Sequence, residues 1–410
     1  MCRAGEVLIL ATAFPPELLS GSKRPFRMAK YLPGCGYSTH VVTASHESCT
    51  LGWRNVHVAP VAKPAPDVVR ASYILEKIQR YCLPYNDRLP WIPHAIAVAE
   101  EVMRGRGVST VLSTSPPVGS HFAAAVLKRR YGIRWIADFR DPLYGNPWRS
   151  RRAAWIYDMA LERYIVRNAD AVIANTDTAG EALRRRYPSL AQKIFVVWNG
   201  YDPDDKVEAA PIPPRDFRVL AHIGSLGGGR HPGLLLDSIG RLSGRGLLDL
   251  RTIRLRLIGS MDPNEPWFNR PSCQGLIERG CLEYTGKTIP EPEARRQMSE
   301  ADFLLLLDLN NSNASLQLPA KLFEYLRIGR PILAFTCPGS PTEQILANSG
   351  VPHRCLHPAD PPERIDGALG EFLRLPSTPV AASPWFWDTF GAPAHAQMLA
   401  QILDSWQCNR

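Results

Sequence analysis

The sequence predicts an α/β protein made of two Rossmann-like, doubly wound domains that face each other across a cleft. Short apolar runs alternate with helical segments almost throughout the 410 residues, which is typical of βα units and parallel sheets. A turn and a proline-rich stretch, residues 199–214, interrupt this alternation near the middle of the chain. A chain of this length also exceeds one ordinary domain.

In the first half, apolar runs bounded by turn residues predict buried strands, and the longer segments between them predict helices. The expected strands are residues 7–11, 37–43, 110–113, 134–139, 171–174 and 194–197. The expected helices include residues 24–32, 121–130, 154–167 and 179–187. These elements make up the first expected domain, residues 1–205.

The second half repeats the alternation after the proline-rich stretch. Its expected strands are residues 219–223, 253–258, 282–285, 303–307, 331–335 and 351–353. They predict a second domain, residues 206–384, joined to the first by one hinge. An aromatic-rich helical segment, residues 385–410, follows, and we expect it to pack back onto the first domain.

Composition restricts the classes of partner. The net charge of +9 and the pI near 9.1 favour anionic partners such as nucleotides, phosphorylated lipids, membrane surfaces or nucleic acid. Aromatic residues are not interleaved with the arginine clusters, which disfavours nucleic acid. The nine cysteines are scattered without a Cys-x-x-Cys pair, so we expect no zinc site and infer a reducing, cytoplasmic environment. We also expect no signal peptide and no membrane-spanning helix.

The most informative stretch runs from Leu318 to Leu326 and is closed by a glycine and a proline. Proline suits the first turn of a helix, so we expect a helix that starts at Pro319 and ends at Gly329. Lys321 and Glu324, three residues apart, share one face near its N-terminus. A cation, a carboxylate and a positive dipole end suit a nucleotide diphosphate. The alternative is a surface ion pair on an ordinary amphipathic helix.

A glycine-rich loop, residues 224–231, opens the second expected domain after a strand. Glycines such as Gly224, with Ser225 beside it, let backbone amides approach a phosphate, and Arg230 adds a charged fork. The spacing is neither that of a dinucleotide fingerprint nor that of a nucleotidase loop. The alternative is a flexible turn without a ligand.

Two further turns follow strands of the first expected domain, where open α/β sheets bind ligands. One contains Gly21 and Ser22, and the other contains Arg140 and Asp141. The acidic residues around Arg140 are equally compatible with a structural ion-pair network.

Two other motifs have a structural explanation. Ser340 and Glu343 fit a capping box at the start of a helix, and this role suffices for Glu343 even though the same helix end faces the expected cleft. We interpret the Asp-x-Asp pattern at Asp202 as a turn and not as a metal site.

The motifs occur in an order that resembles glycosyltransferase family 4 over nearly the whole chain. They are Phe14-Pro15-Pro16, Gly21-Ser22, Arg24, Thr114-Ser115-Pro116-Pro117, Ala137-Asp138-Phe139-Arg140-Asp141-Pro142, Asn199-Gly200-Tyr201-Asp202, Gly224-Ser225-Leu226, Arg230 and Pro319-x-Lys321-x-x-Glu324-Tyr325. The resemblance implies a retaining enzyme of the GT-B fold. Such an enzyme binds a nucleotide-sugar donor in its second domain and an acceptor in its first.

The resemblance also implies roles for the candidate residues. Arg230 and Lys321 would neutralise the donor diphosphate beside Gly224 and Ser225, and Glu324 would accept hydrogen bonds from the ribose. Lys287 falls where the family holds the base, and Glu343 near the donor. Gly21 and Ser22 resemble a loop that closes on the phosphates and sugar, and Arg140 and Asp141 would lie beside the reacting sugar.

Two departures from the family pattern concern charge. Leu316 stands where the family carries its first glutamate, which contacts the sugar. Ser225 stands where many members carry a second phosphate-binding arginine, and we expect Lys321 to compensate for it.

The implied function is transfer of a sugar, with retention and without a metal or other cofactor, to a glycan, a lipid-linked or a small-molecule acceptor, as in polysaccharide biosynthesis. One alternative is a nucleotide-sugar 2-epimerase of the same fold. Another is a non-catalytic protein that binds a membrane surface or an anion. The stretch from Trp148 to Trp155 joins indole rings to arginines, which predicts peripheral association with the inner face of a membrane.

Overall fold

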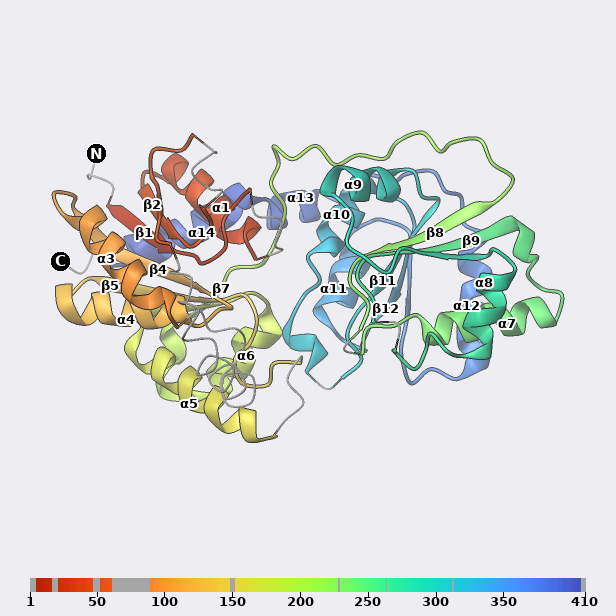
Figure 1. Cartoon of the computed structure of the whole chain (residues 1–410), viewed down its shortest axis with the longest axis horizontal. Helices are drawn as coiled ribbons and strands as arrows, with labels where there is room; N and C mark the ends of the chain where they lie inside the picture. Colours follow the sequence, from red (N-terminus) through yellow and green to blue (C-terminus); the bar gives the residue numbers. More distant parts are fainter. Residues whose placement is uncertain are drawn as a thin grey trace, which may run out of the picture. The chain divides into compact units, whose positions relative to one another are not determined.

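The computed structural model describes residues 5–16, 21–46, 52–60, 89–147, 152–227, 229–262, 264–311 and 313–406. The chain divides into two compact units. The first comprises Met1–Asp202 and Phe390–Arg410, and the second comprises Pro203–Thr389. Each unit contains one parallel sheet with helices packed on it (Figure 1), which confirms the predicted fold class of two doubly wound α/β domains.

The first unit is built on a seven-stranded sheet in the order β3-β2-β1-β4-β5-β6-β7. Its strands are β1 (Glu6–Leu10), β2 (Ser38–Thr43), β3 (Val56–Val58), β4 (Val108–Ser115), β5 (Arg134–Phe139), β6 (Ala171–Ala174) and β7 (Ile194–Val196). Its helices are α1 (Lys23–Tyr31), α3 (Trp91–Met103), α4 (Gly119–Tyr131), α5 (Arg152–Asn168), α6 (Asp177–Arg186) and α14 (Ala392–Asp404). The strand order reverses between β1 and β4.

Both faces of this sheet are covered, which explains why strands such as β1 and β6 are almost wholly apolar. Val7 and Ile9 of β1 pack with α1 and α14 on one face. Leu8 and Leu10 pack with α3, α4 and α6 on the other. The last helix of the chain therefore completes the core of the first unit, because Leu399 and Leu403 of α14 are buried against β1.

The second unit contains a six-stranded sheet in the order β10-β9-β8-β11-β12-β13. Its strands are β8 (Arg218–Ile223), β9 (Ile253–Ile258), β10 (Leu282–Tyr284), β11 (Phe303–Leu307), β12 (Ile332–Phe335) and β13 (His353–Leu356). Its helices are α7 (Gly233–Gly244), α8 (Pro271–Glu278), α9 (Glu291–Ser299), α10 (Lys321–Ile328), α11 (Pro341–Asn348), α12 (Pro362–Phe372) and α13 (Pro384–Phe390). The order reverses between β8 and β11.

Helix α10 ends where the sequence predicts. Gly329 adopts a φ of 74° after the last helical residue, and a Cβ atom at this position would lie 2.3 Å from the carbonyl oxygen of Val380. Only glycine fits both the left-handed conformation and this close approach. The helix begins at Lys321, with Ala320 at the N-cap position, so Pro319 lies just ahead of the first turn and not within it.

The structure corrects the predicted elements at three places. The last strand, β13, spans His353–Leu356 and not residues 351–353, because the edge strand is polar and partly exposed while the buried Val351 precedes it. Strand β3 and helix α3 were not predicted. Among the described residues, no helix has the length and apolarity needed to cross a membrane.

Candidate active site

In an open parallel sheet, ligands bind at the carboxyl ends of the strands where the strand order reverses. Each unit has one such point, between β1 and β4 in the first and between β8 and β11 in the second. Most of the predicted site residues follow strands next to these two points, and the two groups are described separately below.

At the reversal point of the first unit, a buried ion pair ties α1 to β5. Arg24 donates from Nη2 to Oδ1 of Asp138 over 2.7 Å and from Nε to Oδ2 over 3.0 Å. Thr114 donates to the same carboxylate over 2.7 Å. The other Arg24 contacts are the carbonyls of Val197 and Trp198. Asp138 is fully buried and saturated by donors, so this pair has a structural role.

The structure brings Gly21 and Arg140 together. The guanidinium of Arg140 donates to the carbonyls of Gly21 and Pro116, and its Nε donates to that of Ser115 over 3.3 Å. A Cβ atom on Gly21 would lie 2.7 Å from Nη1 of Arg140. Arg140 therefore fastens the Gly21 turn to the turn that follows β4.

The other two predicted residues of the first unit flank this contact. Asp141 is partly exposed next to Arg140, and Ser22 is buried at the N-cap position of α1. Burial lowers the pKa of Arg140, whereas the carboxylates of Asp138 and Asp141 oppose this shift.

Sequence reasoning missed His121, which lies beneath the end of β4. Its two ring nitrogens lie 2.7 Å from Oγ of Ser113 and 2.8 Å from Oγ of Ser115. Burial lowers the pKa of His121 to about 3, so the ring is neutral. The two serines alternate with Thr114 along β4 and so point to the same face of the sheet, which is the sequence signal that could have revealed the cluster.

At the reversal point of the second unit, Gly224 and Lys321 meet. A Cβ atom on Gly224 would lie 2.8 Å from Cε and 3.2 Å from Nζ of Lys321. Tyr325, one turn further along α10, accepts a hydrogen bond at its hydroxyl from the backbone N–H of Ile223 over 3.1 Å. The N-terminal turn of α10 is thereby held against the end of β8.

Arg230 lies at the end of a short closed turn. The backbone N–H groups of Gly227 and Arg230 each donate to the other residue's carbonyl, over 2.9 and 3.1 Å. The charge of Arg230 acts on the same buried histidine as Lys321, because both cations lower the pKa of His222. Two of the predicted residues, Gly224 and Lys321, are therefore in contact, and the charge of the third, Arg230, acts on the histidine beside them.

Asp308, at the end of β11, is a second residue that the sequence analysis did not propose. It accepts hydrogen bonds from the hydroxyls of Thr342 and Thr336 over 2.9 and 3.2 Å and from the backbone N–H of Leu309. Burial raises its pKa, and Arg230 is among the groups that lower it. Asp308 therefore links the end of β11 to the residue directly after β12 and to the first turn of α11.

The predicted capping box at α11 is confirmed. Oγ of Ser340 accepts a hydrogen bond from the N–H of Glu343 over 3.2 Å. The carboxylate of Glu343 accepts from the N–H of Gly339 over 2.6 Å and lies 3.3 Å from Nε2 of His357. Both carboxylate oxygens of Glu343 thus contact the structure around the start of this helix.

The remaining predicted residues of the second unit are partly or fully exposed. Glu324 is partly buried on α10, and its charge acts on Arg295 of α9. Ser225 is exposed, and its Oγ accepts a hydrogen bond from Ser260 over 2.9 Å. Lys287 is exposed after the edge strand β10, and adjacent parallel strands lie about 4.8 Å apart. Lys287 therefore lies about two strand spacings from the end of β8.

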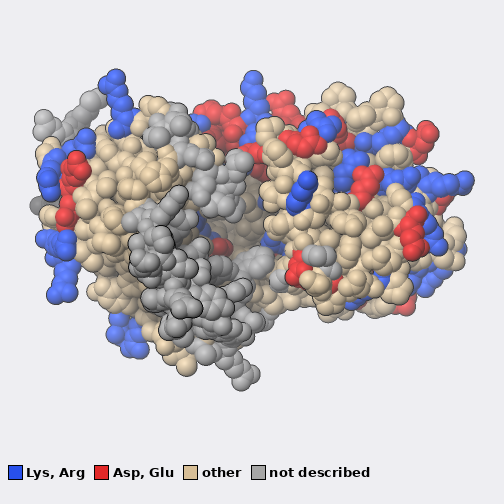
Figure 2. Space-filling view, in the orientation of Figure 1, with Lys and Arg blue, Asp and Glu red and all other residues tan. Residues whose placement is uncertain are grey.

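The Asp202 motif forms a turn, as predicted. The Asp202 carboxylate accepts hydrogen bonds from Nζ of Lys30 over 2.8 Å and from the hydroxyl of Tyr31 over 2.5 Å. No group of metal-ligating side chains occurs in the described part of the chain. On the face shown in Figure 2, basic and acidic side chains are interspersed over both units and form no continuous basic stripe.

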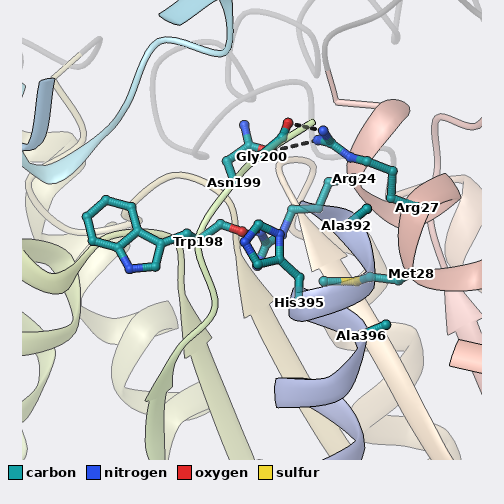
Figure 3. A pocket seen from close by; sticks show the side chains of 9 residues that line it. All are labelled: Arg24, Arg27, Met28, Trp198, Asn199, Gly200, Ala392, His395 and Ala396. Carbon is teal, nitrogen blue, oxygen red and sulfur yellow. Dashed lines mark hydrogen bonds between the residues drawn. The ribbon is translucent and has the colours of Figure 1, made fainter. Parts of the chain in front are cut away.

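A small pocket with a cavity volume of about 10 Å³ lies in the first unit between α1, the segment after β7 and α14 (Figure 3). Met28 and His395 are among the residues that line it. Arg27 also lines it and donates to Oδ1 of Asn199 over 2.8 Å and to the carbonyl of Gly200. Because the pocket is smaller than usual ligand sites and Arg27 is already paired, we do not assign it a substrate.

Comparison with known proteins is consistent with this geometry. Residues 22–200 match the model of a glycosyl transferase 4-like domain. No curated protein sequence matches the chain. Among solved structures, sucrose-phosphate synthase from Thermosynechococcus elongatus is 14% identical with a TM-score of 0.66, covering 99% of this chain and 100% of that one.

Two other solved structures bear on the alternatives. HepE of Anabaena, solved with UDP and glucose, is 14% identical with a TM-score of 0.64, covering 98% of this chain and 100% of that one. The UDP-GlcNAc 2-epimerase from Methanocaldococcus jannaschii is 11% identical with a TM-score of 0.54, covering 98% of this chain and 99% of that one. At these identities the similarities establish the fold alone.

Proposed function

We propose that this chain, whose residues 22–200 match the model of a glycosyl transferase 4-like domain, is a glycosyltransferase that moves a sugar from a nucleoside-diphosphate sugar to a glycan, lipid-linked or small-molecule acceptor. The observation that carries the proposal is the contact of Lys321 with Gly224 at the end of β8, where the charge of Arg230 acts on the same buried histidine as that of Lys321. This location combines two cations, a glycine turn and the N-terminus of α10, which together suit a diphosphate.

In the proposed donor complex, Lys321 and Arg230 contact the phosphate oxygens, and the backbone next to Gly224 and Ser225 approaches them. Glu324, one turn into α10, accepts hydrogen bonds from the ribose. Lys287, two strands away at the sheet edge, lies near the base. HepE was solved with UDP, which makes UDP the first nucleotide to test.

We propose transfer with retention at the anomeric carbon. The bond from this carbon to the diphosphate breaks, the bond to the acceptor oxygen forms on the same face, and the acceptor proton moves to a phosphate oxygen. Negative charge grows on the diphosphate, where fixed cations stabilise it before the reaction begins. Arg230 and Lys321 supply this positive charge, so the proposed transfer requires no metal.

In the first unit, we propose that Asp141 contacts the reacting sugar or its acceptor. Arg140 supports this role indirectly, because its guanidinium holds the Gly21 turn and the turn after β4 next to Asp141. The acceptor itself is proposed to bind to the first unit.

Thermal stability in the presence of nucleotides tests the donor proposal. We expect UDP or another nucleoside diphosphate, and its sugar conjugate, to raise the Tm, because a ligand at 100 times its Kd stabilises the folded state by about 2.7 kcal/mol. Inorganic phosphate at the same concentration is the control. No shift with any nucleoside diphosphate would contradict the proposal.

Product analysis separates the transferase from a 2-epimerase. A transferase needs an acceptor to form a glycoside, whereas an epimerase inverts the sugar carbon without one. Formation of the C2 epimer from donor alone would overturn the transferase proposal in favour of the epimerase.

An exposed face of α5 favours a lipid surface as the location of the acceptor. Ile156, Tyr157 and Tyr164 are 67%, 48% and 45% exposed, and Arg163 and Arg167 are exposed on the same face. The acidic residues of this helix, Asp158 and Glu162, are buried. The outer face of α5 therefore combines apolar, aromatic and cationic side chains, as in helices that lie on anionic membranes. Trp148 and the arginines beside it fall outside the described residues.

Vesicle flotation tests this surface. We expect the protein to float with vesicles that contain anionic lipid and to remain in solution with zwitterionic ones, since the helix supplies cations as well as apolar groups. The double variant Ile156→Ser, Tyr157→Ser should reduce flotation. The matched control is Leu247→Ser, which removes an equally exposed apolar side chain from the second unit, 70% exposed. Equal recovery with both lipids, or an unaffected α5 variant, would contradict the proposal.

A further inference from the structure

His222, the penultimate residue of β8, lies beneath the proposed phosphate location. Its side chain is 2% exposed, and its Nδ1 lies 2.9 Å from the carbonyl oxygen of Leu305 on the adjacent strand β11. A carbonyl oxygen can only accept, so Nδ1 carries the hydrogen and donates it. In a neutral imidazole the other nitrogen, Nε2, is then an acceptor.

This acceptor is directed toward the proposed phosphate location. Nε2 has no hydrogen-bond partner among the described residues, and it would lie 3.1 Å from a Cβ atom on Gly224. The same point lies 3.2 Å from Nζ of Lys321. The edge of the imidazole and the ammonium group therefore border one small space beside the glycine turn. A buried acceptor without a donor is unfavourable, and Lys321 is the adjacent donor.

Burial and the two neighbouring cations keep the ring neutral, and the hydrogen bond to the Leu305 carbonyl opposes them. Lys321 approaches from α10, Arg230 from the closed turn after β8, and the Leu305 carbonyl from β11. Burial together with the two cations lowers the pKa of His222 to about 3. The ring is thus uncharged at neutral pH and does not compete with Lys321 for an anion.

We propose that His222 is a positioning residue whose Nε2 accepts a hydrogen bond from the ammonium group of Lys321 and holds it in place for a phosphate. Lysine is a point charge on a flexible four-carbon stem, unlike the planar arginine fork. A hydrogen bond from one N–H of Lys321 to Nε2 would restrict the rotation of this stem and fix the direction of the ammonium group. The inference rests on the proposed function for the phosphate, but the contact between His222 and Lys321 does not.

Nitrogen NMR of the histidine side chains in the full-length protein tests the contact without a ligand. We expect His222 to show the tautomer with hydrogen on Nδ1. In Lys321→Met, we expect the chemical shift of Nε2 to move toward the value of an unprotonated nitrogen that accepts no hydrogen bond. The opposite tautomer, or an unchanged Nε2 resonance in Lys321→Met, would overturn the proposal even if the protein binds no nucleotide.

Calorimetric titration with UDP tests the consequence for binding. His222→Asn preserves a donor for the Leu305 carbonyl and removes the Nε2 acceptor, so we expect about ten- to a hundredfold weaker binding, the range of one hydrogen bond to a charged group. His222→Gln, which places an amide oxygen near the Nε2 position, should lose less. In the Lys321→Met background, His222→Asn should have no further effect, because the two residues act as a unit.

Two outcomes of the titration would reject the inference. Additive losses in the double variant would mean that His222 acts independently of Lys321. Weaker binding of UDP-glucose with unchanged binding of UDP would mean that Nε2 contacts the sugar. If wild-type protein does not bind UDP at all, the donor proposal for UDP fails, and the NMR measurement still decides whether Nε2 and Lys321 are paired.

Discussion

At the scale of single residues, the candidate site depends on a lysine and a glycine that are distant in sequence and adjacent in space. Gly224 leaves room for the Lys321 side chain, because any Cβ atom there would approach Cε to 2.8 Å. Lys321 can lie across the end of β8 only while residue 224 has no side chain. Both residues are partly exposed, so neither carries much of the stability of the second unit.

Replacing Lys321 by alanine is expected to slow sugar transfer by about a hundredfold or more, the usual loss when one fixed donor to a developing anion is removed. The midpoint of unfolding should change little. Steady-state transfer rates and thermal unfolding of the same preparation check both parts. Gly224→Ala should also slow transfer, because it displaces the ammonium group without removing the charge.

The control for these two variants is Arg374→Ala. Arg374 is an exposed cation of the second unit, and its neighbours Leu373 and Leu375 accept hydrogen bonds from Arg218, the first residue of β8. It therefore lies at the opposite end of the strand from Gly224. A transfer rate that falls as much in Arg374→Ala as in Lys321→Ala would show that only overall charge matters.

At the scale of elements, the two loops that follow β8 and β9 interlock. Gly259, directly after β9, has a φ of 145°, and a Cβ atom there would lie 2.1 Å from the carbonyl oxygen of Gly224. The N–H of Gly224 in turn donates to the carbonyl of Ile258 over 2.7 Å. The backbone that carries the proposed phosphate turn is thus positioned by its neighbouring strand and not only by its own sequence.

Gly259→Ala is expected to destabilise the second unit by about 1–3 kcal/mol, the range for a residue forced into a sparsely populated conformation. It should also weaken nucleotide binding, because the Gly224 turn must move. Denaturant unfolding and thermal shift with UDP are the measurements. The control is Gly244→Ala at the end of α7, where a Cβ atom meets nothing within 4 Å. Equal stability of the two variants would contradict the steric argument.

At the scale of the whole molecule, each unit buries a neutral histidine close to the point where its strand order reverses. His121 lies under the end of β4, and His222 lies under the end of β8. Burial lowers the pKa of each to about 3 from an ordinary value of 6.5. The unfolded chain therefore binds more protons than the folded chain between these two pH values.

Acid is accordingly expected to destabilise both units. As the pH falls below 6.5, each histidine lowers the free energy of unfolding by about 1.4 kcal/mol per pH unit until its folded-state pKa is reached. The stability returns when the pH is raised again. Denaturant unfolding at pH 7 and pH 5 measures it. His121→Gln should flatten this dependence for the first unit, whereas His94→Gln, at an exposed position of α3, should not. A wild-type protein that is equally stable at both pH values would contradict the prediction.

Much of the architecture was predictable because it depends on local patterns. Apolar runs such as residues 303–307 and the glycine stop at Gly329 specify strands and helix ends within a few residues. The edge strand β13 was misplaced and β3 was missed, because both are short and only partly buried. Their pairing with a neighbouring strand, rather than their own composition, makes them strands.

The sequence by itself determined the alternation of strands and helices, the break between the two units, and the residue types that suit a diphosphate. Only the tertiary structure decided which of those residues meet. It placed Lys321 over Gly224 and beside His222, and it assigned Arg140 to backbone carbonyls and Glu343 to a helix start. The physical reason is that spacing along a chain sets local conformation, whereas proximity between distant strand ends depends on the order in which the strands pair in the sheet.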